Sequence, residues 1–137
     1  MSSSIFAQQK EFMDAFDLKT SNTPCFDPDR FYFWDKLIQE EHEEWWKATG
    51  HLLGKQDSID VLAEVAQETI DLIYVLCGFA NALGLQAEEV WNEVHRANMD
   101  KVGEDGKVVK DENGKVQKPE GWQPANIKKI IQNKIGE

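Results

Sequence analysis

Cysteine, proline and long hydrophobic runs are all scarce in this chain. Its 137 residues include two cysteines, Cys25 and Cys77, whose spacing matches no metal or redox motif and predicts reduced thiols. The longest uncharged run, residues 72–87, covers 16 positions, and a membrane helix needs roughly 20 apolar residues. The first residues lack the basic and apolar segments of a secretory signal. We therefore expect a cytoplasmic protein with no membrane partner.

Basic residues are also few. The chain has 15 Lys and Arg against 25 Asp and Glu, a net charge of −10, which argues against a nucleic-acid partner. Residues 1–105 contain 8 basic and 21 acidic side chains, whereas residues 106–137 contain 7 and 4. An acidic body that handled a phosphorylated ligand would need metal ions between the like charges.

Hydrophobic periodicity predicts helices over residues 3–17, 28–49, 57–83, 86–102 and 125–135. Between the last two, short Val-containing runs flank Asp-Glu-Asn-Gly, which favours a β-hairpin. The expected fold is all-α, a four-helix bundle with a small C-terminal β-hairpin and a short terminal helix. Residues 1–105 would be the helical catalytic domain, and residues 106–137 a tail packed on it or on a neighbouring chain.

Acidic side chains stand where the core of the helix over 28–49 should be. At about 100° per residue, Glu40, Glu41 and Glu44 fall inside the apolar stripe of that helix, and Glu43 falls on its polar side. In the next helix, Glu68 and Asp71 are three residues apart and share a face. Antiparallel packing would bring five carboxylates into one partly buried cleft.

Burying unpaired carboxylates costs several kcal/mol each, and few basic residues stand nearby. Between residues 31 and 95 the only ones are Lys36, Lys47 and Lys55. Divalent cations are the simplest solution, and an all-oxygen ligand set favours Mg²⁺ or Mn²⁺. A solvated acidic surface is the simpler alternative, but it does not explain acids within apolar stripes. A ferritin-like di-iron site needs Glu-x-x-His, which the sequence lacks.

The pattern Glu40-Glu41-x-x-Glu44, then 23 residues, then Glu68-x-x-Asp71, resembles the EExxE…ExxD signature of the all-α nucleoside triphosphate pyrophosphohydrolases. These include MazG-like enzymes, dimeric dUTPases and phosphoribosyl-ATP pyrophosphohydrolases. The resemblance covers roughly residues 30–102. The tail also resembles phage and bacterial phosphoribosyl-ATP-pyrophosphohydrolase-like MazG relatives, among them viral MazZ-type enzymes that act on (d)GTP; a viral protein would work in the host cytoplasm.

The resemblance implies a MazG-like bundle that hydrolyses a nucleoside triphosphate to the monophosphate and pyrophosphate, with two or more Mg²⁺ or Mn²⁺ ions per site. It implies that Glu41, Glu44, Glu68 and Asp71 are metal ligands. Glu40 would bind a second metal or orient the attacking water. It also implies a homodimer or a homotetramer.

Three further side chains are candidates for the phosphate side of the substrate, spaced three apart in the helix over 86–102: His95, Asn98 and Lys101. The resemblance to the viral relatives that act on (d)GTP slightly favours a purine, dGTP-like substrate. Alternatives are dUTP or phosphoribosyl-ATP as substrate, or a non-catalytic helical module that binds a nucleotide or metal.

Overall fold

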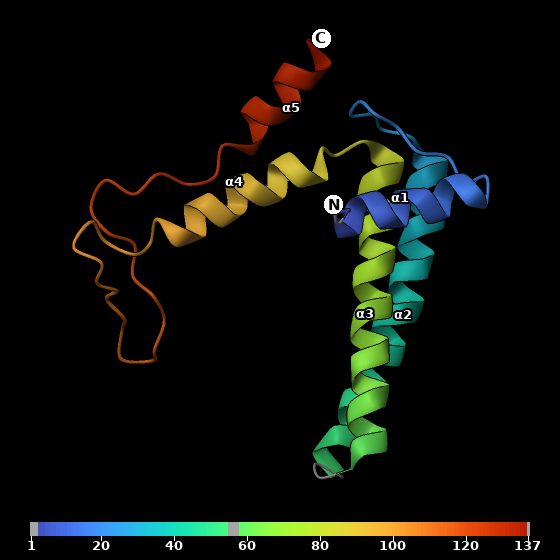
Figure 1. The fold of residues 1–137 in the computed structure, drawn as a ribbon, viewed down its shortest axis with the longest axis horizontal. Coiled ribbons are helices and arrows are strands. Elements are labelled where there is room, and N and C mark those ends of the chain that lie inside the picture. Colours follow the sequence, from blue (N-terminus) through green and yellow to red (C-terminus); the bar gives the residue numbers. More distant parts are fainter. Residues whose placement is uncertain (1–2, 55–57, 137) are drawn as a thin grey trace. The chain divides into compact units, whose positions relative to one another are not determined.

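The computed structural model describes residues 3–54 and 58–136 (Figure 1). Its helices are α1 (Ile5–Ala15), α2 (Pro28–Gly54), α3 (Ile59–Leu83), α4 (Ala87–Met99) and α5 (Ile127–Ile135). These described ranges contain no strand, so the predicted all-α class is confirmed. The chain divides into two compact units, residues 1–87 and 88–137. The expected division into residues 1–105 and 106–137 stays a prediction.

In the first unit, α2 and α3 lie side by side and run antiparallel, with α1 across them (Figure 1). Contacts at both ends fix this direction. Near the start of α2, Arg30 Nη1 donates to the carbonyl oxygen of Ala82, at the end of α3, over 2.9 Å. At the other end, His51 Nδ1 lies 2.9 Å from Glu64 Oε1, near the start of α3. Residues 40–44 and 68–71 therefore lie on facing helices.

The core of this unit forms around Trp34 of α2, which is 4% exposed, together with Met13 of α1 and Ala82 of α3. The Trp34 ring lies directly over Gly78, where a Cβ atom would overlap it. Glycine at this position lets α2 and α3 approach closely.

Side chains and glycine conformation set the limits of α3 as its sequence predicts. Ser58 is the N-cap, and its side chain accepts a hydrogen bond from the Val61 amide. Gly84 ends the helix in the left-handed region, with φ of 62°. Residue 57, included in the predicted helix, lies outside the described residues.

Two predictions about local structure were wrong. Helix α2 continues through Gly50 to Gly54, because one interior glycine costs only about 1 kcal/mol relative to alanine and the His51–Glu64 contact lies beyond it. The C-terminal β-hairpin is not present in the described residues either. A single antiparallel bridge joins Lys110 and Val116. Val109 there is 65% exposed, and an isolated pair of strands without a buried face is marginal in water.

No single helix among the described residues is long and apolar enough to cross a membrane; only α3 and α4 taken together as a bent pair meet that test.

Candidate active site

Three glutamates from the facing helices converge in the first unit. Glu41 and Glu44 on α2 and Glu68 on α3 each offer a carboxylate oxygen, and these three atoms lie within 4.8 Å of one another. The Oε2 atoms of Glu41 and Glu68 are shielded from solvent and lack a hydrogen-bond partner among the described residues. Such atoms have lost their water without gaining a donor, which is costly unless a cation binds them.

The electrostatics of the cluster agree with its geometry. Burial raises the pKa of Glu41, and the charges of Glu44, Asp71 and Glu68 raise it further. Burial also raises the pKa of Glu68, with additional contributions from the charges of Glu44, Asp71 and Glu64. Burial and the neighbouring charges therefore make Glu41 and Glu68 harder to ionise.

No lysine or arginine relieves this repulsion: across residues 3–54 and 58–136, the ion pairs include none of Glu41, Glu44, Glu68 and Asp71. The group thus consists of converging oxygens of like charge without a basic partner among the described residues. Mg²⁺ and Mn²⁺ prefer such oxygen ligands. The residues present fit a divalent cation.

The other predicted acids lie beside this group. Asp71 on α3 accepts a hydrogen bond from Gln67 Nε2 over 3.0 Å at its Oδ1 atom, and its charge acts on both Glu41 and Glu68. Glu40 is exposed on α2, outside the three converging oxygens.

The predicted phosphate-side residues belong to the second unit. His95 and Asn98 are exposed and Lys101 is half-buried. The Nζ atom of Lys101 donates to Asn98 Oδ1 over 3.0 Å, so these two side chains act as a pair. His95 and this pair remain proposed substrate-binding residues.

Sequence reasoning missed two features. The first is the His51–Glu64 contact, which joins α2 to α3 next to the cluster; it was missed because Gly50 was expected to end the helix. The second is Arg96, which forms ion pairs with Glu93 over 2.8 Å and Asp100 over 2.7 Å. Its signal was present, because acids stand three residues before it and four after it, the spacing of neighbours on a helical surface.

The family model of phosphoribosyl-ATP pyrophosphohydrolase matches residues 9–98. The chain belongs to the phosphoribosyl-ATP pyrophosphohydrolase family. This family is part of the MazG-like superfamily of nucleoside triphosphate pyrophosphohydrolases, and membership supports an enzyme with a nucleotide pyrophosphohydrolase activity. The matched residues include the whole acidic cluster but not Lys101 or the tail. No curated protein matches the chain significantly.

Proposed function

We propose that this protein hydrolyses a (deoxy)nucleoside triphosphate to its monophosphate and pyrophosphate in a reaction that depends on Mg²⁺ or Mn²⁺, with a purine, dGTP-like substrate slightly favoured. The observation that carries this proposal is the convergence of Glu41, Glu44 and Glu68 on facing helices, with one buried oxygen each of Glu41 and Glu68 lacking a hydrogen-bond partner among the described residues. Membership of a pyrophosphohydrolase family supports the reaction that we propose for these carboxylates.

In the proposed site, Glu41, Glu44, Glu68 and Asp71 hold the cations, two or more per site. A bound divalent ion supplies positive charge that offsets the phosphate oxygens and acidifies water. The reaction forms a bond between a water oxygen and the α-phosphorus, breaks the bond from that phosphorus to the bridging α–β oxygen, and releases pyrophosphate. Glu40 accepts the proton of the attacking water or contributes to a second cation site. Asn98, Lys101 and His95 bind the phosphate groups of the substrate.

A second substrate, phosphoribosyl-ATP, is favoured by one specific observation. The matching family model is that of phosphoribosyl-ATP pyrophosphohydrolase. The same cluster would serve, because this substrate is also cleaved at a phosphoanhydride bond. dUTP is the third substrate to compare.

The proposed enzyme acts as a homodimer or homotetramer. Several apolar side chains of α3 are exposed: Ile59 by 82%, Leu62 by 49%, Ile70 by 58% and Ile73 by 40%. At 100° per residue they lie within about 80° of one another, on the side opposite Glu68 and Asp71. A second copy of the chain can cover this stripe and leave the acidic cluster accessible.

Pyrophosphate release from a panel of ribo- and deoxynucleoside triphosphates, dUTP and phosphoribosyl-ATP, with Mg²⁺, Mn²⁺ or EDTA, tests the proposal. We expect metal-dependent release, fastest with a purine deoxynucleotide. Release from phosphoribosyl-ATP alone would establish the second candidate. If no substrate is cleaved while metal still binds, the chain is a nucleotide- or metal-binding module and the proposed activity is wrong.

A further inference from the structure

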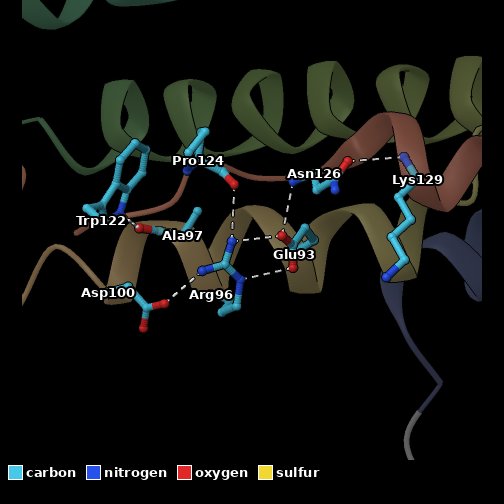
Figure 2. A network of polar contacts seen from close by, with 8 residues as sticks. All are labelled: Glu93, Arg96, Ala97, Asp100, Trp122, Pro124, Asn126 and Lys129. Carbon is cyan, nitrogen blue, oxygen red and sulfur yellow. Dashed lines mark hydrogen bonds and ion pairs between the residues drawn. The ribbon is translucent and has the colours of Figure 1, made fainter.

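At the end of α4, one carbonyl oxygen accepts a hydrogen bond from a side chain of the tail instead of from the helix. In a regular α-helix the Lys101 amide would donate to the carbonyl oxygen of Ala97, but here it donates to that of Asn98 over 3.2 Å. The freed Ala97 oxygen accepts a hydrogen bond from the indole Nε1 of Trp122 over 2.6 Å (Figure 2). A tail residue thus satisfies a helix-end carbonyl next to the Asn98–Lys101 pair.

A tight turn directs Trp122 back to the helix. The Trp122 amide donates to the carbonyl oxygen of Pro119 over 3.1 Å, and Gly121, the third residue of this turn, has a φ of 81°. That value matches the third position of a type II turn, where glycine avoids steric strain. We call residues 119–126 the strap.

Two further contacts bind the strap to α4, as Figure 2 shows. Arg96 Nη2 donates to the carbonyl oxygen of Pro124 over 3.3 Å, and the Asn126 amide donates to Glu93 Oε1 over 3.0 Å. Hydrogen bonds from Arg96 and the Asn126 amide lower the pKa of Glu93 to about 2. Glu93 is therefore ionised at neutral pH, and the strap is anchored along the helix as well as at its end.

The Trp122 ring also lies close to the side chains of two lysines. The Nζ atom of Lys101 lies 5.7 Å from the ring centroid and that of Lys118 lies 4.9 Å away, both within the range of a cation–π interaction. Lys101 is thereby restrained from two directions, by the Trp122 ring and by Asn98 Oδ1 over 3.0 Å.

We propose that Trp122 is a positioning residue, which orients the Asn98–Lys101 pair for the phosphate groups of the substrate without touching the substrate itself. The inference rests on the proposed function, because it takes Asn98 and Lys101 as phosphate-binding residues. It assigns a role to the tail, which lies outside the residues that the family model matches.

Steady-state kinetics of the full chain with its best substrate and metal test this role. Trp122→Phe keeps an aromatic ring but removes the donor to Ala97. One hydrogen bond contributes about 0.5–1.5 kcal/mol, so we expect KM to rise roughly three- to tenfold with kcat within about twofold. In a Lys101→Ala background the same substitution should change KM by less than about twofold, because the residue it positions is gone. The matched control is Trp91→Phe, the same substitution at a site on α4 that is 60% exposed. It should leave KM and kcat unchanged.

The outcomes separate this inference from the proposed function. If the unaltered chain releases no pyrophosphate from any substrate, both are wrong. If it is active and Trp122→Phe leaves KM unchanged, the positioning role alone is wrong. A KM increase that persists in full in the Lys101→Ala background also contradicts it, because Trp122 would then act through something other than Lys101.

Discussion

At the scale of single residues, Glu68 is the member of the like-charged group that α3 contributes to the three converging oxygens. Its carboxylate converges with those of Glu41 and Glu44, and one of its oxygens is buried and unpaired. Replacing it with glutamine keeps the shape but removes a charged ligand. Loss of even an outer partner at a metal site costs roughly 10- to 100-fold, so Glu68→Gln should lower turnover at least about 100-fold.

The same substitution should not destabilise the metal-free protein, because it removes a repelling charge. Thermal unfolding in EDTA should give a Tm equal to or above that of the unaltered chain. Glu43→Gln, on an exposed position of the same helix segment, is the control and should keep its turnover. Full activity of Glu68→Gln would show that the cluster is not the active site.

The raised pKa values of Glu41 and Glu68 predict how stability depends on pH in the absence of metal. Their folded-state pKa values lie above 4.5, the ordinary value for a glutamate, so the folded protein binds more protons than the unfolded chain as pH rises above 4.5. Stability should therefore fall as pH rises from 4.5 through the folded-state pKa values, and then level off. Unfolding in EDTA across this range measures the slope, and Glu68→Gln should reduce it. A slope that the substitution leaves unchanged would mean that other groups control it.

The sequence was informative about these residues because helical spacing fixes which acids share a face. The contact between the strap and α4 could not be predicted from the sequence. The hydrogen bond from Trp122 to Ala97 joins residues 25 apart, and the turn between them has no periodic signal. The sequence also could not distinguish Glu40 from its converging neighbours, because Glu40, Glu41 and Glu44 all fall within one sector of about 100° on the helix.

At the scale of helices, the approach of α2 to α3 depends on Gly78. A Cβ there would overlap the Trp34 ring and lie 2.7 Å from Gln9 Nε2. Gly78→Ala should therefore destabilise the fold by about 1–3 kcal/mol, the range for overpacking a core. Gly50, inside α2, has nothing within 4 Å of its Cβ position. Gly50→Ala should instead stabilise the fold by about 0.5–1 kcal/mol.

Chemical denaturation of the two variants, compared with the unaltered chain, measures both effects. Equal effects would mean that Gly78 contributes only its backbone freedom and that the ring contact is unimportant.

The two glycines, Gly50 and Gly78, also show why the end of α2 was predicted wrongly from the sequence alone. Glycine marks a close helix contact at one position and an unremarkable helix interior at the other, and only the neighbouring helix distinguishes them.

Tertiary contacts also determine whether strands form in the segment between α4 and α5. The valine runs and the Asp-Glu-Asn-Gly turn have the local chemistry of a hairpin, and Gly114 adopts a positive φ of 82°. A ladder needs a buried face as well, and Val108 and Val109 are 44% and 65% exposed. The turn forms with one bridge and no strands within the described residues, so turn chemistry was predictable while sheet formation was not.

At the scale of the whole molecule, the two faces of α3 have different partners. Gly78 and Ala82 face α2 and the core, on the same side as Glu68 and Asp71. Helix α1 packs beside the later part of α3, where the Phe12 and Tyr74 rings lie 5.5 Å apart. The earlier part leaves exposed the apolar stripe of Ile59, Leu62, Ile70 and Ile73, which is the surface proposed for a second copy.

Ile70→Glu places a charge in the middle of this stripe and should convert the assembly to monomers, because burying an unpaired carboxylate at an interface costs several kcal/mol. Sedimentation or light scattering of the full chain measures the mass. Gln132→Glu, exposed on α5, adds the same charge elsewhere and should leave the mass unchanged. An unaltered chain that is monomeric at all concentrations would contradict the assembly. The stripe would then be covered by other residues of the same chain, and Ile70→Glu would lower its Tm without changing its mass.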